Sequence, residues 1–272
     1  MKIKMSNIAA QLWTIRKYAR TLPDFADAMQ RIGRMGYPAV QLSGVGPIPA
    51  SDIARAVKGA GLRMCATHVS WAALRDQTEK MIEDHLLWEC PHVAIGALPD
   101  EYRTAEGLKR FCGELPPVVW KLRKAGLDFS YHNHSHEFMK LPDGRTWLEA
   151  LYADTAGDLL LAELDLYWIR HGKGDPAQWI RRVADRSVLL HLKDMKMVGN
   201  EPRFAEIGEG CLEWDGILEA AAASRVEWYI VEQDECYGRN PFDSLALSLK
   251  NLQSMVAGDQ KCRSSCGCKC CG

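Results

Sequence analysis

The sequence predicts a (β/α)8 barrel, and three observations support this fold class. Short apolar runs rich in β-forming residues alternate with longer segments of helical period, and each kind occurs eight times. The apolar runs are almost continuous, as in parallel strands that are buried on both faces. No Gly-x-Gly-x-x-Gly follows the first run, which argues against the rival fold, a doubly wound open sheet.

The alternation places each element along the chain. The predicted strands are residues 8–13, 39–43, 63–68, 92–96, 127–132, 159–165, 187–193 and 227–232. The predicted helices are residues 22–36, 50–61, 74–89, 104–126, 146–157, 175–185, 214–224 and 241–255. Pro176 lies in the first turn of the sixth helix and Gly36 ends the first, as helix boundaries require. Because no linker interrupts the pattern, we expect one catalytic domain, residues 1–257.

Composition narrows the class of protein. Of the 272 residues, 47% are hydrophobic and 25% are charged, so a sizeable core can form. The net charge is −1 without a basic cluster, which argues against nucleic-acid binding. No run of 18 apolar residues and no leader-like start occurs, so we expect a soluble, cytoplasmic protein without a membrane partner. A homo-oligomeric state is left open.

The ten cysteines fall into two groups. Five are scattered singly and are interpreted as reduced thiols. The other five crowd the stretch CRSSCGCKCCG within residues 258–272, which has no hydrophobic pattern. The spacing would suit a clamp for Zn²⁺ or Cu⁺, but we expect a disordered tail because nothing nearby can build a core.

Polar side chains gather at the predicted carboxyl ends of the strands, where barrels carry their chemistry. In chain order these side chains are Gln11, Trp13, Gln41, His68, His132, His134, Glu137, Glu163, Asp165, His191, Lys193, Asp194, Glu232 and Asp234. Singly, such a histidine is more often a hydrogen-bonded loop residue, and such an acid is often a helix cap. Several carboxylates at one mouth, however, are costly to desolvate unless a cation neutralises them. Carboxylate oxygens with an imidazole suit Mn²⁺, Zn²⁺, Co²⁺ or Fe²⁺.

Five stretches in a fixed order resemble a known superfamily. They are YHNHSHEF (131–138), LAELDLYWIRHGKGDP (161–176), LLHLKDMK (189–196), EIGEG followed by WDGIL (206–210 and 214–218), and YIVEQD (229–234). Together they resemble the xylose-isomerase-like (β/α)8 superfamily of sugar phosphate isomerases and epimerases. That superfamily includes inosose dehydratase-like and ketose 3-epimerase-like groups, with apurinic-site endonucleases as more distant kin.

The resemblance implies one divalent metal, held by an acid from strand 5, Asp from strand 6, His from strand 7 and Glu from strand 8. Carried over, the ligands are Glu137, Asp165, His191 and Glu232. Many relatives place the strand 5 glutamate directly at the strand end, where this chain has His132 or His134, so a histidine is the alternative to Glu137. Mn²⁺ is the expected ion, with Zn²⁺, Co²⁺, Fe²⁺ and Mg²⁺ as alternatives.

The same resemblance assigns the remaining roles. The expected catalytic residues are Glu137, Glu232, His134 and Lys193, and the expected substrate-binding residues are His68, His132, Trp13, Trp168 and Lys193. Asn133 and His136 are interpreted as structural. Both tryptophans, Trp13 and Trp168, could equally have a packing role between the barrel strands and the surrounding helices.

These expectations lead to a reaction class. A metal that chelates a hydroxyl and the adjacent carbonyl acidifies the C–H between them, and two acid–base groups can then exchange that proton. We therefore expect a metal-dependent isomerase or epimerase of a sugar or keto-sugar that acts through an enediolate. The alternative is a lyase, a dehydratase or eliminating enzyme acting on a keto-inositol or 3-keto glycoside. An apurinic-site endonuclease and a non-catalytic sugar-binding protein are less favoured.

Overall fold

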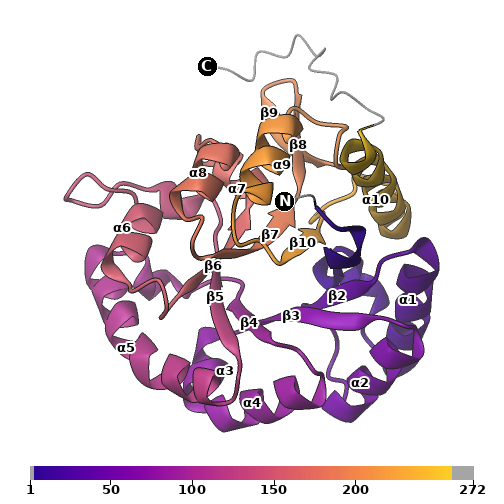
Figure 1. The fold of residues 1–272 in the computed structure, drawn as a ribbon, viewed down its shortest axis with the longest axis horizontal. Coiled ribbons are helices and arrows are strands. Elements are labelled where there is room, and N and C mark those ends of the chain that lie inside the picture. Colours follow the sequence, from indigo (N-terminus) through magenta and orange to yellow (C-terminus); the bar gives the residue numbers. More distant parts are fainter. Residues whose placement is uncertain (1–2, 259–272) are drawn as a thin grey trace.

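Eight parallel strands close into a barrel in the computed structural model, which describes residues 3–258 (Figure 1). The strands are β1 (Ile8–Gln11), β2 (Ala39–Leu42), β3 (Arg63–Val69), β4 (His92–Ile95), β5 (Asp128–His132), β6 (Leu161–Asp165), β7 (Ser187–Leu192) and β10 (Trp228–Val231). Each strand pairs with the next along the chain, and β10 closes the barrel by pairing with β7 and β1. The predicted fold class is confirmed, and all eight predicted strands are present.

Helices surround the barrel (Figure 1). They are α1 (Leu22–Met35), α2 (Ala50–Gly59), α3 (Trp71–Asp76), α4 (Thr78–Leu87), α5 (Ala105–Lys124), α6 (Trp147–Asp154), α7 (Leu166–His171), α8 (Pro176–Arg182), α9 (Trp214–Ala222) and α10 (Pro241–Ala257). The segment predicted as one helix, 74–89, is broken at Gln77, whose backbone leaves the helical region (φ −132°, ψ 38°). The short helix α7 was not predicted. It begins directly at the end of β6, where the Asp165 side chain accepts a hydrogen bond from the Trp168 amide.

A β-hairpin at the mouth of the barrel was not among the predicted strands. Strands β8 (Asp194–Val198) and β9 (Glu201–Ala205) pair antiparallel between β7 and α9. Gly199, at φ +62°, and Asn200 connect them, and this two-residue Gly-Asn turn is a known hairpin signal. The hairpin therefore follows directly from the carboxyl end of β7, where site residues were expected.

The interior of the barrel changes character along its axis. Its lower layer is apolar and formed by Ala9, Ala39, Cys65, Ala66, Leu161, Val188, Leu189 and Ile230. A larger apolar core lies between the strands and the helices. Because side chains alternate along a strand, Leu161, Glu163 and Asp165 share the inward face of β6. The polar residues thus lie above an apolar floor, toward the carboxyl ends.

Two further expectations concern membrane-spanning helices and the cysteine-rich stretch. No helix among residues 3–258 is long and apolar enough to cross a membrane. Helix α10 ends at Gly258, which caps it in the left-handed conformation (φ +81°). The cysteine-rich stretch lies beyond that residue, outside the described residues.

Candidate active site

Three of the four expected metal ligands meet at the carboxyl end of the barrel. Asp165 is paired with His191 in the β6–β7 register, and Glu232 directly follows β10, the other neighbour of β7. His191 Nδ1 lies 2.8 Å from Glu232 Oε2 and 3.9 Å from Asp165 Oδ2. All three side chains are buried. Parallel register and inward alternation therefore bring together residues that are up to 67 positions apart, from 165 to 232.

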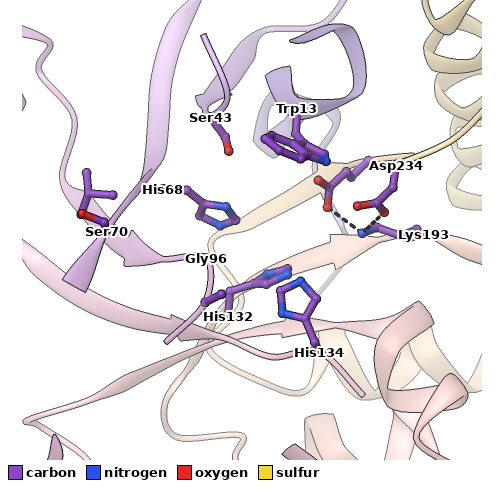
Figure 2. A pocket seen from close by; sticks show the side chains of 12 residues that line it. Trp13, Ser43, His68, Ser70, Gly96, His132, His134, Lys193 and Asp234 are labelled. Atoms are coloured by element: carbon purple, nitrogen blue, oxygen red, sulfur yellow. Dashed lines mark ion pairs between the residues drawn. The ribbon is translucent and has the colours of Figure 1, made fainter. Parts of the chain in front are cut away.

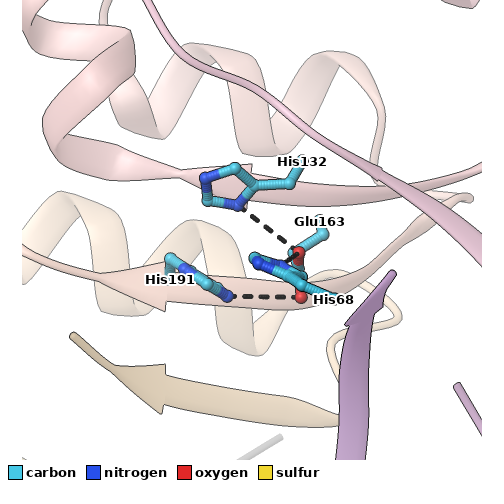
Figure 3. A group of neighbouring side chains, drawn as sticks. All are labelled: His68, His132, Glu163 and His191. Carbon is cyan, nitrogen blue, oxygen red and sulfur yellow. Dashed lines mark hydrogen bonds and ion pairs between the residues drawn. The ribbon is translucent and has the colours of Figure 1, made fainter. Parts of the chain in front are cut away.

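A second polar group lies next to these three residues and surrounds Glu163 (Figure 3). His68 Nε2 is 2.5 Å and His132 Nδ1 is 3.4 Å from Glu163 Oε2. The Gln41 amide donates to Glu163 Oε1 at 2.6 Å, and the Gln11 amide donates to Gln41 Oε1 at 2.6 Å. These contacts make Glu163 the centre of a buried, almost fully hydrogen-bonded network.

His191 connects the two groups through its two ring nitrogens. Nε2 lies 3.2 Å from Glu163 Oε1 and 2.7 Å from Gln41 Oε1, while Nδ1 faces Glu232 and Asp165. Histidines that bind metals commonly hold the other ring nitrogen against a carboxylate or carbonyl, which fixes the ring orientation. Glu163 and Gln41 are placed to do this for His191, so Nδ1 is the nitrogen that would bind a metal once it has given up its proton.

Lys193 lies among carboxylates on the same inward face as His191. Its ammonium is 2.9 Å from Asp165 Oδ2, 2.8 Å from Glu232 Oε2 and 2.6 Å from Asp234 Oδ2, and it is buried (Figure 2). Burial opposes its charge, but attraction to the three carboxylates outweighs burial and holds the pKa of Lys193 well above its usual value. Lys193 therefore carries a positive charge near neutral pH.

The electrostatic balance of the site favours a further cation. Burial opposes the charge of His191, but Glu163 and Glu232 outweigh it and raise its pKa to about 10. Burial, reinforced by Glu232, raises the pKa of Asp165 to about 6. Four carboxylates (Glu163, Asp165, Glu232 and Asp234) thus face two cationic side chains, Lys193 and His191. Asp165 Oδ2 is buried and lacks a hydrogen bond, although Lys193 is close.

The donor atoms fit a divalent metal. Asp165 Oδ2, His191 Nδ1 and Glu232 Oε2 supply two carboxylate oxygens and an imidazole nitrogen, a set that suits Mn²⁺, Zn²⁺, Co²⁺ or Fe²⁺. His132 adds a fourth donor nearby, because its Nε2 lies 3.9 Å from Asp165 Oδ2. The residue from the end of β5 that lies next to these donor atoms is thus a histidine, His132.

The placement of Glu137 differs from the prediction. It lies in a short 3-10 helix, His136–Phe138, beyond the end of β5. Its carboxylate accepts hydrogen bonds at 2.8 Å from the Tyr131 hydroxyl and at 2.8 Å from the His134 amide, and it lies 3.1 Å from His136 Nε2. The structure groups it with His134 and His136, not with Asp165, His191 and Glu232. Glu137 lies five positions beyond the strand end, and its carboxylate turns back to brace its own loop.

The stretch YHNHSHEF divides into support and pocket lining. The Asn133 side chain joins β5 to β6 by accepting from the Asp165 amide at 3.0 Å. His132 and His134 line the pocket (Figure 2). Burial lowers the pKa of His134 to about 4, so its imidazole is neutral near pH 7 and can accept a proton.

The pocket at the mouth has a volume of about 330 Å³ and is lined by Trp13, Ser43, His68, Val69, Ser70, Gly96, Ala97, His132, His134, Lys193, Glu232 and Asp234. Trp13 lies on one side of the pocket and is partly exposed (Figure 2). Gly44, at φ +67°, allows this position, because a Cβ there would lie 2.4 Å from the Trp13 ring. Trp168 does not line the pocket; its ring packs against His134 at 5.3 Å between centroids.

Asp194 has a structural role that the sequence did not reveal. Its carboxylate accepts hydrogen bonds from the amides of Met195, Gly208, Gly210 and Leu212 and from the indole N–H of Trp214. A Cβ at Gly210 would lie 2.2 Å from Asp194 Oδ1, so the glycine is required there. The stretch EIGEG followed by a tryptophan is therefore a loop wrapped around one buried carboxylate, next to Lys193.

Comparisons with known proteins agree with this architecture. A sugar phosphate isomerase/epimerase from Parabacteroides distasonis is 23% identical and superimposes with a TM-score of 0.77, covering 93% of this chain and 95% of its own. The two chains share the (β/α)8 barrel fold. A xylose isomerase-like TIM barrel protein from Mycobacterium smegmatis, solved in complex with magnesium, gives a TM-score of 0.72 at 12% identity, with 94% of this chain and 99% of that chain covered.

A third similar structure is the probable 3-DHS dehydratase AsbF from Bacillus anthracis. It has a TM-score of 0.69 at 14% identity, and 91% of this chain and 98% of that chain are covered. No protein-family model and no curated protein matches the sequence. At these identities the likenesses show a shared fold.

Proposed function

We propose that the protein is a divalent-metal-dependent isomerase or epimerase of a sugar or keto-sugar. The observation that carries the proposal is the convergence of Asp165, His191 and Glu232, with two carboxylate oxygens facing one imidazole nitrogen in a buried mouth. These three side chains would hold the ion, and His132 takes the place first given to Glu137. Mn²⁺ is the proposed ion, although one similar barrel was solved in complex with magnesium.

The bound ion would acidify a C–H beside a substrate carbonyl, as a Lewis acid. The chain's own groups then move the proton. Glu232 is held ionised, because attraction to Lys193 and His191 outweighs burial and keeps its pKa well below the usual range. His134 is neutral near pH 7 and lines the same pocket. We assign the role of proton acceptor to Glu232 and that of donor at the enediolate to His134, which, being neutral, first takes up a proton from a substrate hydroxyl or from water.

The remaining lining would orient the sugar. Trp13 offers a partly exposed ring for stacking, and His68 faces the pocket while its Nε2 is held by Glu163. Lys193 lines the pocket and can contact a substrate oxygen. Trp168 supports this wall from behind His134.

A lyase acting on a keto-inositol or 3-keto glycoside is the second candidate. Its support is the likeness to the probable dehydratase and the presence in the same pocket of His134, which can protonate a leaving hydroxyl once it has itself taken up a proton. Both reactions begin with the same proton removal, so the products distinguish them.

The test is metal analysis followed by a substrate screen. We expect about one divalent ion per chain and turnover of a keto-sugar or inosose that is lost with a chelator and restored by Mn²⁺. An epimer or isomer of equal mass supports the first candidate, and loss of water supports the second. DNA with an abasic site is included as a substrate, and cleavage of it alone would overturn both candidates.

A further inference from the structure

Lys193 occupies the position where a cation is most needed. Its ammonium lies within 2.9 Å of Asp165 Oδ2, Glu232 Oε2 and Asp234 Oδ2. Two of these oxygens, on Asp165 and Glu232, are the same atoms that face His191 Nδ1. The lysine thus neutralises the very atoms proposed to hold the metal.

The main chain next to Lys193 is fixed. The following residue, Asp194, is locked by hydrogen bonds from four backbone amides and one indole. The rings of Trp168 and Phe204 lie 5.7 Å and 5.6 Å from the ammonium. Any movement of the charge must therefore come from the flexible side chain rather than from the backbone.

The three carboxylates differ in exposure. The side chains of Asp165 and Glu232 are 0% and 5% exposed, whereas that of Asp234 is 22% exposed, at the rim. An ammonium that leaves the inner pair can remain paired with Asp234. Asp234 has no other ion pair in the described part of the chain.

We propose that Lys193 is an internal counter-ion for the metal site, which keeps the metal-free barrel stable and weakens metal binding, and which moves toward Asp234 when the ion binds. The inference rests on the proposed function, because it assumes a metal on Asp165, His191 and Glu232. Buried carboxylates without a cation are costly, and a fixed positive charge beside a divalent ion repels it.

The first experiment removes the charge of Lys193 but keeps roughly the length of its side chain. Lys193→Met is compared with wild type and with Lys196→Met, a matched control three residues along on exposed β8. Mn²⁺ titration calorimetry should show binding at least about tenfold tighter in Lys193→Met and unchanged in Lys196→Met. The melting temperature of metal-free Lys193→Met should fall by several degrees, and saturating Mn²⁺ should remove most of this deficit.

The second experiment tests the movement toward Asp234. Asp234→Asn should weaken Mn²⁺ binding several-fold in the wild-type background, because the displaced ammonium loses its partner. In the Lys193→Met background the same substitution should have a clearly smaller effect. Equal effects in both backgrounds would show that Asp234 acts only through its charge, and the movement would be wrong.

The outcomes separate this inference from the proposed function. If wild type binds Mn²⁺ and Lys193→Met binds it equally or more weakly, the counter-ion role is wrong and the metal site stands. If neither protein binds any divalent ion, both ideas fall. A Lys193→Met protein that folds only when Mn²⁺ is present would support the inference. If Lys193→Met does not fold at all, two other variants decide the question. Lys193→Arg should keep the wild-type affinity for Mn²⁺, and Asp234→Asn should weaken Mn²⁺ binding several-fold.

Discussion

Glu163 Oε1 lies 3.2 Å from His191 Nε2, and this contact turns the other ring nitrogen of His191 toward Asp165 and Glu232. Burial opposes the charge of Glu163, but His68 and His191 outweigh it and hold its pKa well below the usual range. Glu163 is therefore an ionised support for the histidine, fully buried behind the pocket.

Replacing Glu163 by Ala should lower Mn²⁺ affinity by roughly 10–100-fold, because groups that orient a metal-binding histidine typically contribute that much. Calorimetry measures the change. Glu227→Ala is the matched control, since Glu227 pairs with a buried histidine, His92 Nε2 at 3.0 Å, before the start of β10 and away from the pocket. Unchanged affinity in a folded Glu163→Ala protein would contradict the orienting role.

Comparing Glu137→Ala with His132→Ala tests which residue at or after the end of β5 binds the metal. The first substitution leaves the Tyr131 hydroxyl and the His134 amide without their acceptor, so unfolding by urea should show a loss of about 1–3 kcal/mol. Its Mn²⁺ affinity should stay within a few-fold of wild type. His132→Ala should bind Mn²⁺ much more weakly. The opposite pattern would show that Glu137, and not His132, binds the metal.

Most of this arrangement could be predicted from the sequence because side chains alternate along a barrel strand. The place of a residue in its strand therefore decides whether its side chain points inward. Once eight strands were assigned, inward alternation placed Asp165, His191 and Lys193 at one mouth, and the structure brings them together. Glu163 was on the same face, but no local signal distinguishes a ligand from the residue that orients a ligand. That distinction depends on which nitrogen of a ring faces which carboxylate.

Residues in loops were harder to place. Glu137 follows the strand by five positions, and a loop has no period from which its direction can be derived. The hairpin β8–β9 was missed although Gly199 and Asn200 carry a turn signal, because its strands, Asp194–Val198 and Glu201–Ala205, lack the continuous apolar run that marks the strands of the barrel. Asp194 could not be assigned because its five donors come from residues 195–214.

The loop that carries His134 ends in a helix cap with a predictable pH dependence. At the start of α6, Glu149 accepts from the Thr146 amide at 2.7 Å and from Arg182 at 2.7 Å. The backbone hydrogen bond from Thr146 is the main cause that lowers its pKa from 4.5 to about 2. Because the folded pKa is the lower one, the stabilisation is complete above about pH 4.5 and is lost as pH falls toward 2.

Glu149→Gln should therefore unfold in urea with a deficit of about 1 kcal/mol at pH 7, and the gap to wild type should shrink as the pH falls below 4.5. Glu83→Gln, on the exposed side of α4, controls for the loss of a surface carboxylate. A gap that stays constant from pH 7 to pH 3 would show that the carboxylate is not held ionised by the cap.

Glu232 is the residue on which the proposed chemistry depends most directly. Glu232→Gln keeps the shape of the side chain and one oxygen near His191 and Lys193, so some metal binding should survive. Turnover at saturating Mn²⁺ should fall by about 10²–10⁴-fold, the range for removal of a general base. In deuterated water, wild type should place label on the carbon beside the carbonyl, in product or recovered substrate, and the variant should do so far more slowly. If wild type turns substrate over without incorporating label while hydrogen moves directly between carbons, the enediolate route is wrong, and a hydride shift replaces it.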